Sequence, residues 1–87
     1  MTNQTPTIAS TDLFIRLFKD APNWGGIAPA WVTPAERGNL TNLKRSGLLT
    51  TFVSDGDPFA EFTDLGKRLG KDLTGHDEMG RTVAQES

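Results

Sequence analysis

The amino-acid sequence predicts an α+β fold with three helices and one two-stranded β-hairpin. Apolar residues recur at helical spacing in three separate segments, 11–21, 34–46 and 64–73. The dipeptide Asp55-Gly56 lies between two short segments of strand-like composition, a pattern typical of a tight hairpin turn. An isolated hairpin is only marginally stable in water, so we expect the helices to cover its apolar face.

The first helix is expected over Thr11–Ala21, because its apolar residues fall on one face. Ser10 or Thr11 can cap its first turn, and Pro22 ends it. The following segment, residues 22–32, contains two glycines and two prolines. This composition disfavours a regular helix and predicts an ordered loop with room for one helical turn.

The clearest local signal is Thr33-Pro34-Ala35-Glu36, a capping box with proline at the first helical position. The helix that it starts is expected to run to Ser46, and Gly47 is its natural C-terminal stop. Leu40 and Leu43 are expected on the buried side of this helix, which leaves its polar residues on the opposite side.

The hairpin is expected to join residues 48–54 to residues 58–62. A two-residue turn at Asp55-Gly56 sets Phe52 opposite Phe59. Strand alternation then places a core face on one side of the hairpin. That face consists of Leu49, Thr51, Val53, Ala60 and Phe62.

The last helix is expected over Asp64–Leu73, capped by Thr63 and ended by Gly75. Its apolar stripe contains Leu65, Leu69 and Leu73. The expected organisation is one domain over residues 8–73. A flexible arm over residues 1–7 precedes it, and a mobile polar tail over residues 74–87 follows it.

The amino-acid composition disfavours several classes of function. The chain has no cysteine, no tyrosine and one histidine, which leaves no metal site of cysteines or several histidines and no histidine-based catalytic pair. We therefore expect no enzyme activity, no metal and no cofactor. No apolar run approaches the roughly 20 residues of a membrane span, and the N-terminus lacks the features of a leader. A small soluble protein of the cytoplasm is expected.

Two short motifs flank the hairpin. A Leu-x-x-x-Gly-Leu pattern at residues 43–48 precedes it, and a Thr-x-x-Gly helix start at residues 63–66 follows it. These motifs resemble those of winged helix-turn-helix domains of the MarR-like regulators, over roughly residues 33–73. The resemblance implies that the 34–46 helix is a recognition helix and that the hairpin is a wing. The family has a well-formed helix before the recognition helix, whereas residues 22–32 are helix-poor here.

The whole sequence also resembles small proteins encoded by actinobacterial phages. These combine an Asn-Trp-x-Gly segment with R-G-N-L-T and F-T-x-x-G segments, found here at residues 23–26, 37–41 and 62–66. This second resemblance implies no particular activity. It implies that the cytoplasm in question is that of a bacterial host.

The first function expected is binding of double-stranded DNA as a transcriptional regulator. Arginine, lysine, asparagine and threonine side chains can contact base edges or phosphates when a helix lies in the major groove. The candidate DNA-binding residues are Arg37, Thr41, Asn42, Lys44 and Arg45. One small module offers little contact surface, so a homodimer is expected. The hairpin tip, residues 54–57, is acidic and argues against insertion of the wing into the minor groove.

The alternative is a protein-interaction module, for example a phage-encoded modulator of a host protein. Net charge is −2, which disfavours strong non-specific binding to DNA. The candidate partner or dimer surface contains Trp24, Phe52 and Phe59. Two plainer interpretations stay open: Trp24 and Trp31 can pack in the core, and the phenylalanine pair can lie under the arm or the last helix. The polar side of the 34–46 helix can likewise be an ordinary solvated face.

Overall fold

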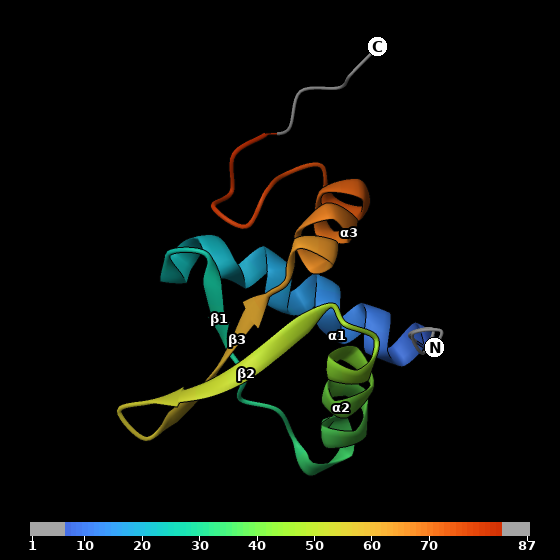
Figure 1. The fold of residues 1–87 in the computed structure, drawn as a ribbon, viewed down its shortest axis with the longest axis vertical. Helices are drawn as coiled ribbons and strands as arrows, with labels where there is room; N and C mark the ends of the chain where they lie inside the picture. Colours follow the sequence, from blue (N-terminus) through green and yellow to red (C-terminus); the bar gives the residue numbers. More distant parts are fainter. Residues whose placement is uncertain (1–6, 83–87) are drawn as a thin grey trace.

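The computed structural model describes residues 7–82, which form three helices and one three-stranded antiparallel sheet (Figure 1). The elements, in chain order, are α1 (Ile8–Asp20), a 3₁₀ turn (Ala21–Trp24), β1 (Ile27–Pro29), a second 3₁₀ turn (Pro34–Glu36), α2 (Arg37–Arg45), β2 (Leu49–Ser54), β3 (Asp57–Phe62) and α3 (Asp64–Thr74). The α+β class and the three helices are confirmed, whereas the sheet has one strand more than expected. No helix in residues 7–82 has the length and apolar character needed to cross a membrane.

The hairpin of β2 and β3 has the register that its turn predicts. Phe52 pairs with Phe59, and Thr51 pairs with Ala60. Asp55 and Gly56 have φ angles of 53° and 82°. Two successive left-handed residues are what a tight primed turn requires, because its twist matches the twist of the strands. The Asp-Gly dipeptide therefore fixes the register of the whole hairpin.

The segment 22–32 is more regular than the loop that its composition predicts. Its first residues belong to a 3₁₀ turn that ends at Gly25, which has a φ of 74°. Residues Ile27–Pro29 then pair with β3, so the sheet order is β1-β3-β2. A three-residue strand is too short to show a period in sequence, and proline is tolerated there because β1 is an edge strand.

Helix α1 begins at Ile8, three residues before the predicted start at Thr11. Its N-cap is Thr7, whose hydroxyl accepts a hydrogen bond from the Ser10 amide at 3.1 Å. Ser10, one of the predicted caps, is instead fully buried in the first turn. Thr7, Ser10 and Thr11 are all residue types that cap helices, and burial decides between them. Residues 1–6, the rest of the predicted arm, lie outside the described residues.

The core lies between α1 and one face of the sheet. The rings of Phe14, Phe18 and Phe62 form a closed triangle, with centroid separations of 5.8, 5.6 and 5.1 Å. Figure 1 shows α2 and α3 on opposite sides of α1, and both contact it. Each helix therefore closes one side of the same core.

The predicted core face of the hairpin is right at its base and wrong at its tip. Leu49, Ala60 and Phe62 are buried, but Val53 is 72% exposed. Figure 1 shows the tip of the hairpin extending beyond the helices, so alternation alone does not bury Val53. Strand alternation selects a face, and only a covering element buries it.

Helix α3 has the predicted start at Asp64, and Gly75 ends it with a φ of 82°. Of the predicted leucine stripe only Leu69 packs against the core, because Leu65 and Leu73 are each 44% exposed. Gly66 and Gly70 are buried instead. A Cβ at Gly66 would overlap the Leu48 carbonyl oxygen, and one at Gly70 would overlap the Phe18 ring. The two glycines thus let α3 approach the core more closely than leucines could.

The packed domain continues past its predicted end at residue 73. His76 pairs with Thr82, and its ring stacks on Phe18 at a centroid separation of 5.6 Å. The Asp77 carboxylate accepts hydrogen bonds from the amides of Arg81 and Met79, which lower the pKa of Asp77. Residues 75–82 therefore belong to the folded unit, and residues 83–87 of the predicted tail lie outside the described residues.

Candidate functional site

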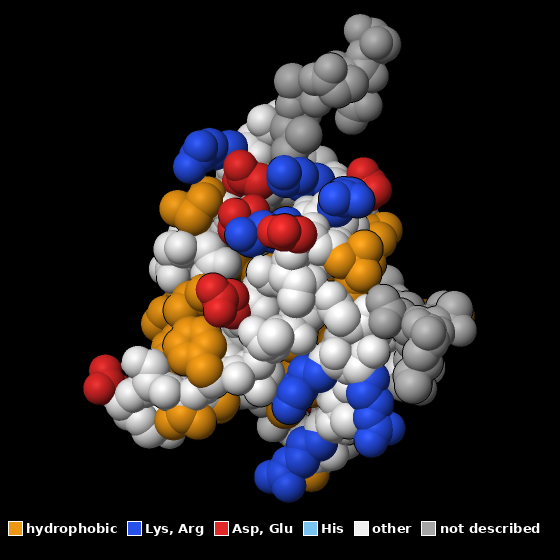
Figure 2. Space-filling model, in the orientation of Figure 1, with side chains coloured by type: hydrophobic (Ala, Val, Ile, Leu, Met, Phe, Trp, Pro, Cys, Tyr) orange, Lys and Arg blue, Asp and Glu red, His pale blue; other side chains and the backbone are white. Residues whose placement is uncertain are grey.

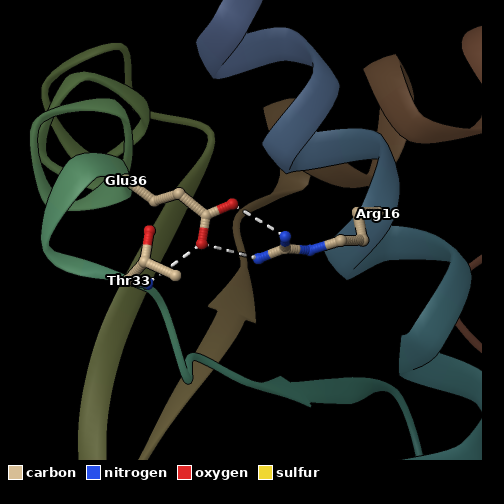
Figure 3. Close-up of polar contacts among 3 residues, drawn as sticks. All are labelled: Arg16, Thr33 and Glu36. Carbon is tan, nitrogen blue, oxygen red and sulfur yellow. Dashed lines mark hydrogen bonds and ion pairs between the residues drawn. The ribbon is translucent and has the colours of Figure 1, made fainter.

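The predicted capping box is confirmed, and it starts the 3₁₀ turn Pro34–Glu36 that leads directly into α2. The Thr33 amide donates to Glu36 Oε1 at 3.0 Å. The same carboxylate pairs with Arg16 of α1, with an Nη1–Oε2 distance of 2.7 Å (Figure 3). Arg16 could not be predicted from the sequence, since nothing local places a residue of α1 beside Glu36. This carboxylate therefore orients α2 relative to α1.

The contacts of Glu36 hold its pKa below the ordinary value of 4.5. The largest cause is the hydrogen bond from the Thr33 backbone, followed by the hydrogen bond from the Arg16 guanidinium. Both contacts favour the charged carboxylate. With its charge already engaged by Arg16 and Thr33, Glu36 does little to offset the cations that follow it in α2.

Replacing Glu36 by glutamine is expected to lower the free energy of unfolding at pH 7. A carboxylate whose pKa is lowered by folding stabilises above its unfolded pKa, and the effect is lost as pH falls through the folded value. The difference between wild type and Glu36→Gln should therefore shrink below pH 4.5. Urea unfolding at pH 7 and pH 3 measures it. Glu61→Gln, on an exposed carboxylate, is the control, and an equal loss for Glu36→Gln at both pH values would contradict the expectation.

The outward side of α2 is cationic. Arg37, Lys44 and Arg45 are exposed, the helix contains no acidic residue, and within residues 7–82 none of the three forms an ion pair. Figure 2 shows basic side chains gathered over α2, at the lower right of the view. At about 100° per residue, Arg37 and Lys44 lie together and Arg45 lies towards the α1 side, with exposed Thr41 between them. We call these four residues the cationic face.

Asn42, the fifth candidate DNA-binding residue, does not lie on the cationic face. It is 9% exposed, and its Oδ1 accepts a hydrogen bond from the Thr7 amide at 3.2 Å. With α1 predicted to start at Thr11, no residue was expected to pack against this part of α2. Because α1 begins earlier, its N-terminus covers Asn42. Thr7, Ser10 and Asn39, which lie at the same contact, were not predicted for the same reason.

The basic residues of α3 do not extend the cationic face. Figure 2 shows the basic side chains over α3 separated from those over α2 by neutral and apolar side chains. On α3, Lys67 pairs with Glu78 at 3.7 Å. The hairpin tip carries exposed Asp55 and Asp57. The cationic face is therefore separate from the basic residues of α3, and the hairpin beside α2 is negative at its tip.

A second surface is aromatic, and it lies on the side of the sheet away from α1. Phe52 stacks on Phe59 at 5.8 Å, and Trp24 contacts both Phe59 and Trp31 at about 6 Å between ring centroids. Trp24, Trp31 and Phe52 are 42%, 59% and 39% exposed, so the tryptophans are not core residues. Phe59 is partly covered, by Trp24 rather than by the last helix. We call these four residues the aromatic surface.

The described residues therefore offer two surfaces suited to binding, one cationic and one aromatic. Within residues 7–82 there is no group of three histidine, cysteine, aspartate or glutamate side chains placed to hold a metal ion. No family model matches the chain, and neither does any curated protein or solved structure.

Proposed function

We propose that the protein binds double-stranded DNA by placing α2 in the major groove, as a small winged-helix-like regulator of transcription. The cationic face carries this proposal, because Arg37, Lys44 and Arg45 are exposed without an acidic neighbour on their helix. Neutralisation of phosphates by such residues supplies much of the affinity of proteins for DNA. The order of elements and the strand order β1-β3-β2 are compatible with a winged-helix-like arrangement.

The geometry of α2 suits this docking. Arg37, Thr41 and Lys44 follow one another at spacings of four and three residues, so they form one stripe along the helix. Arginine can hydrogen-bond base edges in the groove, and threonine and lysine can contact a base or a phosphate. Gly38 is exposed and has open space around it, so the backbone can approach the duplex. Asp55 and Asp57 would be repelled by phosphates, which keeps the hairpin tip out of the minor groove.

A salt titration tests the proposal. The wild-type protein is titrated into fluorescently labelled duplexes, including the region upstream of its own gene, at 50 and 200 mM salt. Three neutralised phosphates predict a loss of affinity of about 40-fold over this range. Fluorescence anisotropy measures it, and the absence of salt-sensitive binding to every duplex would rule the proposal out.

The aromatic surface favours a second candidate function, that of a protein-interaction module, with a second copy of the chain or a host protein as partner. Exposed tryptophan and phenylalanine side chains are common anchors of protein interfaces. Loss of a partner in Trp31→Ala, with that partner retained in Arg37→Ala, would favour this function over DNA binding.

A further inference from the structure

An open hollow of about 380 Å³ lies where the N-terminus of α1 meets α2. It lies at the edge of the cationic face, on the side of Arg45. The side chains that line it are polar, and none of them is acidic. They include Thr7, Ser10, Asn39, Thr41, Asn42 and Arg45.

Two asparagine amides in this hollow have their oxygen atoms already engaged. The Thr7 amide donates to Asn42 Oδ1 at 3.2 Å, and the Ser10 hydroxyl donates to Asn39 Oδ1 at 3.5 Å. Ser10 Oγ in turn accepts from the Thr7 hydroxyl at 2.8 Å. Since the oxygen and nitrogen of an amide point in different directions, both NH₂ groups are left to donate elsewhere.

Of the two NH₂ groups, that of Asn42 is the stronger indication of a binding site. Its residue is only 9% exposed, and the hydrogen bonds of residues 7–82 give this nitrogen no partner. In residues 7–82 every fully buried side-chain nitrogen or oxygen has a hydrogen-bond partner. Since the Asn42 nitrogen has none, it is not fully buried and is accessible to solvent in the hollow. The hydrogen bond to Asn42 Oδ1 fixes the orientation of the amide, so its nearly buried NH₂ group is preorganised to donate to an acceptor atom.

The charge around this donor is positive. The exposed guanidinium of Arg45 brings up to five N–H donors to the same hollow. Helix α1, 13 residues long, directs its positive end at Thr7 and has no acidic residue in its first turn to offset it. Donors, a cation and a helix N-terminus together favour an acceptor-rich anion.

We propose that this hollow binds a phosphate group, through the NH₂ groups of Asn39 and Asn42, the Thr41 hydroxyl and the Arg45 guanidinium. This inference rests on the proposed function, in which the phosphate is part of the backbone of the bound duplex. Free phosphate is the other source of the same chemistry. Asn42 then contacts the backbone rather than a base edge. A contact of this kind positions α2 in the groove without reading sequence.

Three variants that each lower the net charge by one unit test the site. Asn42→Asp keeps an oxygen for the Thr7 amide and replaces the NH₂ donor by a carboxylate oxygen, which the positive end of α1 tolerates. Arg45→Gln removes the guanidinium. Arg68→Gln is the matched control, because Arg68 is exposed on α3 and does not line the hollow.

The first arm titrates each protein with inorganic phosphate at constant ionic strength, followed by ¹H–¹⁵N NMR. Wild type and Arg68→Gln should show shifts concentrated on the lining residues and on the NH₂ signals of Asn39 and Asn42. Asn42→Asp should lose these shifts. Wild-type spectra without local shifts, or local shifts that survive in Asn42→Asp, would overturn the site.

The second arm measures duplex binding with two unrelated DNA sequences. Asn42→Asp and Arg45→Gln should each weaken both duplexes about tenfold relative to Arg68→Gln, with the salt slope reduced by about one. This result identifies the DNA backbone as the source of the phosphate. Local phosphate shifts in a wild-type protein that binds no duplex would support the site for free phosphate while the proposed function fails.

Discussion

Replacing Gly66 by alanine is expected to lower the free energy of unfolding by about 3 kcal/mol or more, the upper part of the range for overpacked sites. In most helices this change stabilises, because glycine costs about 0.5–1 kcal/mol relative to alanine. Here the added methyl would overlap the Leu48 carbonyl oxygen, which accepts a hydrogen bond from the Thr63 amide at 3.1 Å. That oxygen is backbone and cannot rotate aside, so α3 must move away from the core.

Gly38→Ala is the matched control, since it makes the same chemical change in α2. A Cβ at Gly38 meets nothing within 4 Å. This variant should therefore gain the usual 0.5–1 kcal/mol or so of a helical glycine replaced by alanine. Urea unfolding followed by circular dichroism compares the two variants with wild type. A Gly66→Ala protein as stable as wild type would show that α3 does not need this close approach.

The signals that could be predicted from the sequence are those that act within a few residues. The capping box at Thr33 and Glu36 joins positions three apart, and it is present. The Asp55-Gly56 turn supplies its own backbone geometry, which fixes the pairing of Phe52 with Phe59. Such contacts need no information from elsewhere in the chain, so local residue preferences suffice.

The features that the sequence did not reveal depend on residues far apart in the chain. The three residues of β1 become a strand only because the edge of β3 is free to pair with them. Asn42 is covered because α1 starts at Ile8, 34 positions earlier. Leu65 is half exposed because the neighbouring Gly66 permits a closer contact than the leucine stripe could make. Burial by a distant element is not encoded in local periodicity.

The candidate DNA-binding residues divide in the same way. Arg37, Thr41, Lys44 and Arg45 are exposed as the helical period predicts, because together they span about 100° of the helix, on the side away from buried Leu43. Asn42 falls at the boundary of the two sides, where a small change in the neighbouring helix decides its exposure. The period of a helix therefore predicts the centre of its exposed face better than its edges.

Replacing both Arg37 and Lys44 by alanine is expected to weaken duplex binding by about 30-fold or more, taking about 1 kcal/mol for each contact, the lower end of the usual range. Both side chains are exposed and neither is in an ion pair within residues 7–82, so the fold should be unaffected. The protein has a net charge of −2, and a further loss of positive charge weakens attraction to DNA in general. A control must therefore remove the same charge elsewhere.

Arg68→Ala combined with Lys71→Ala is that control, because both residues are exposed on α3 and the change in net charge is identical. If the duplex binds through α2, the control pair should lose much less affinity for it. Anisotropy at one salt concentration measures the affinities, and unfolding curves verify that each variant is folded. Equal losses would mean that general attraction, rather than docking of α2, holds the duplex.

The α2 double variant also separates the two proposals made for this helix. Arg37 and Lys44 do not line the hollow at the N-terminus of α1, whereas Arg45 does. The Arg37→Ala/Lys44→Ala protein should therefore keep the local NMR shifts with inorganic phosphate while losing affinity for duplexes. Loss of both would show that Arg37 and Lys44 attract the anion to the hollow through a long-range electrostatic field, since neither side chain lines the hollow.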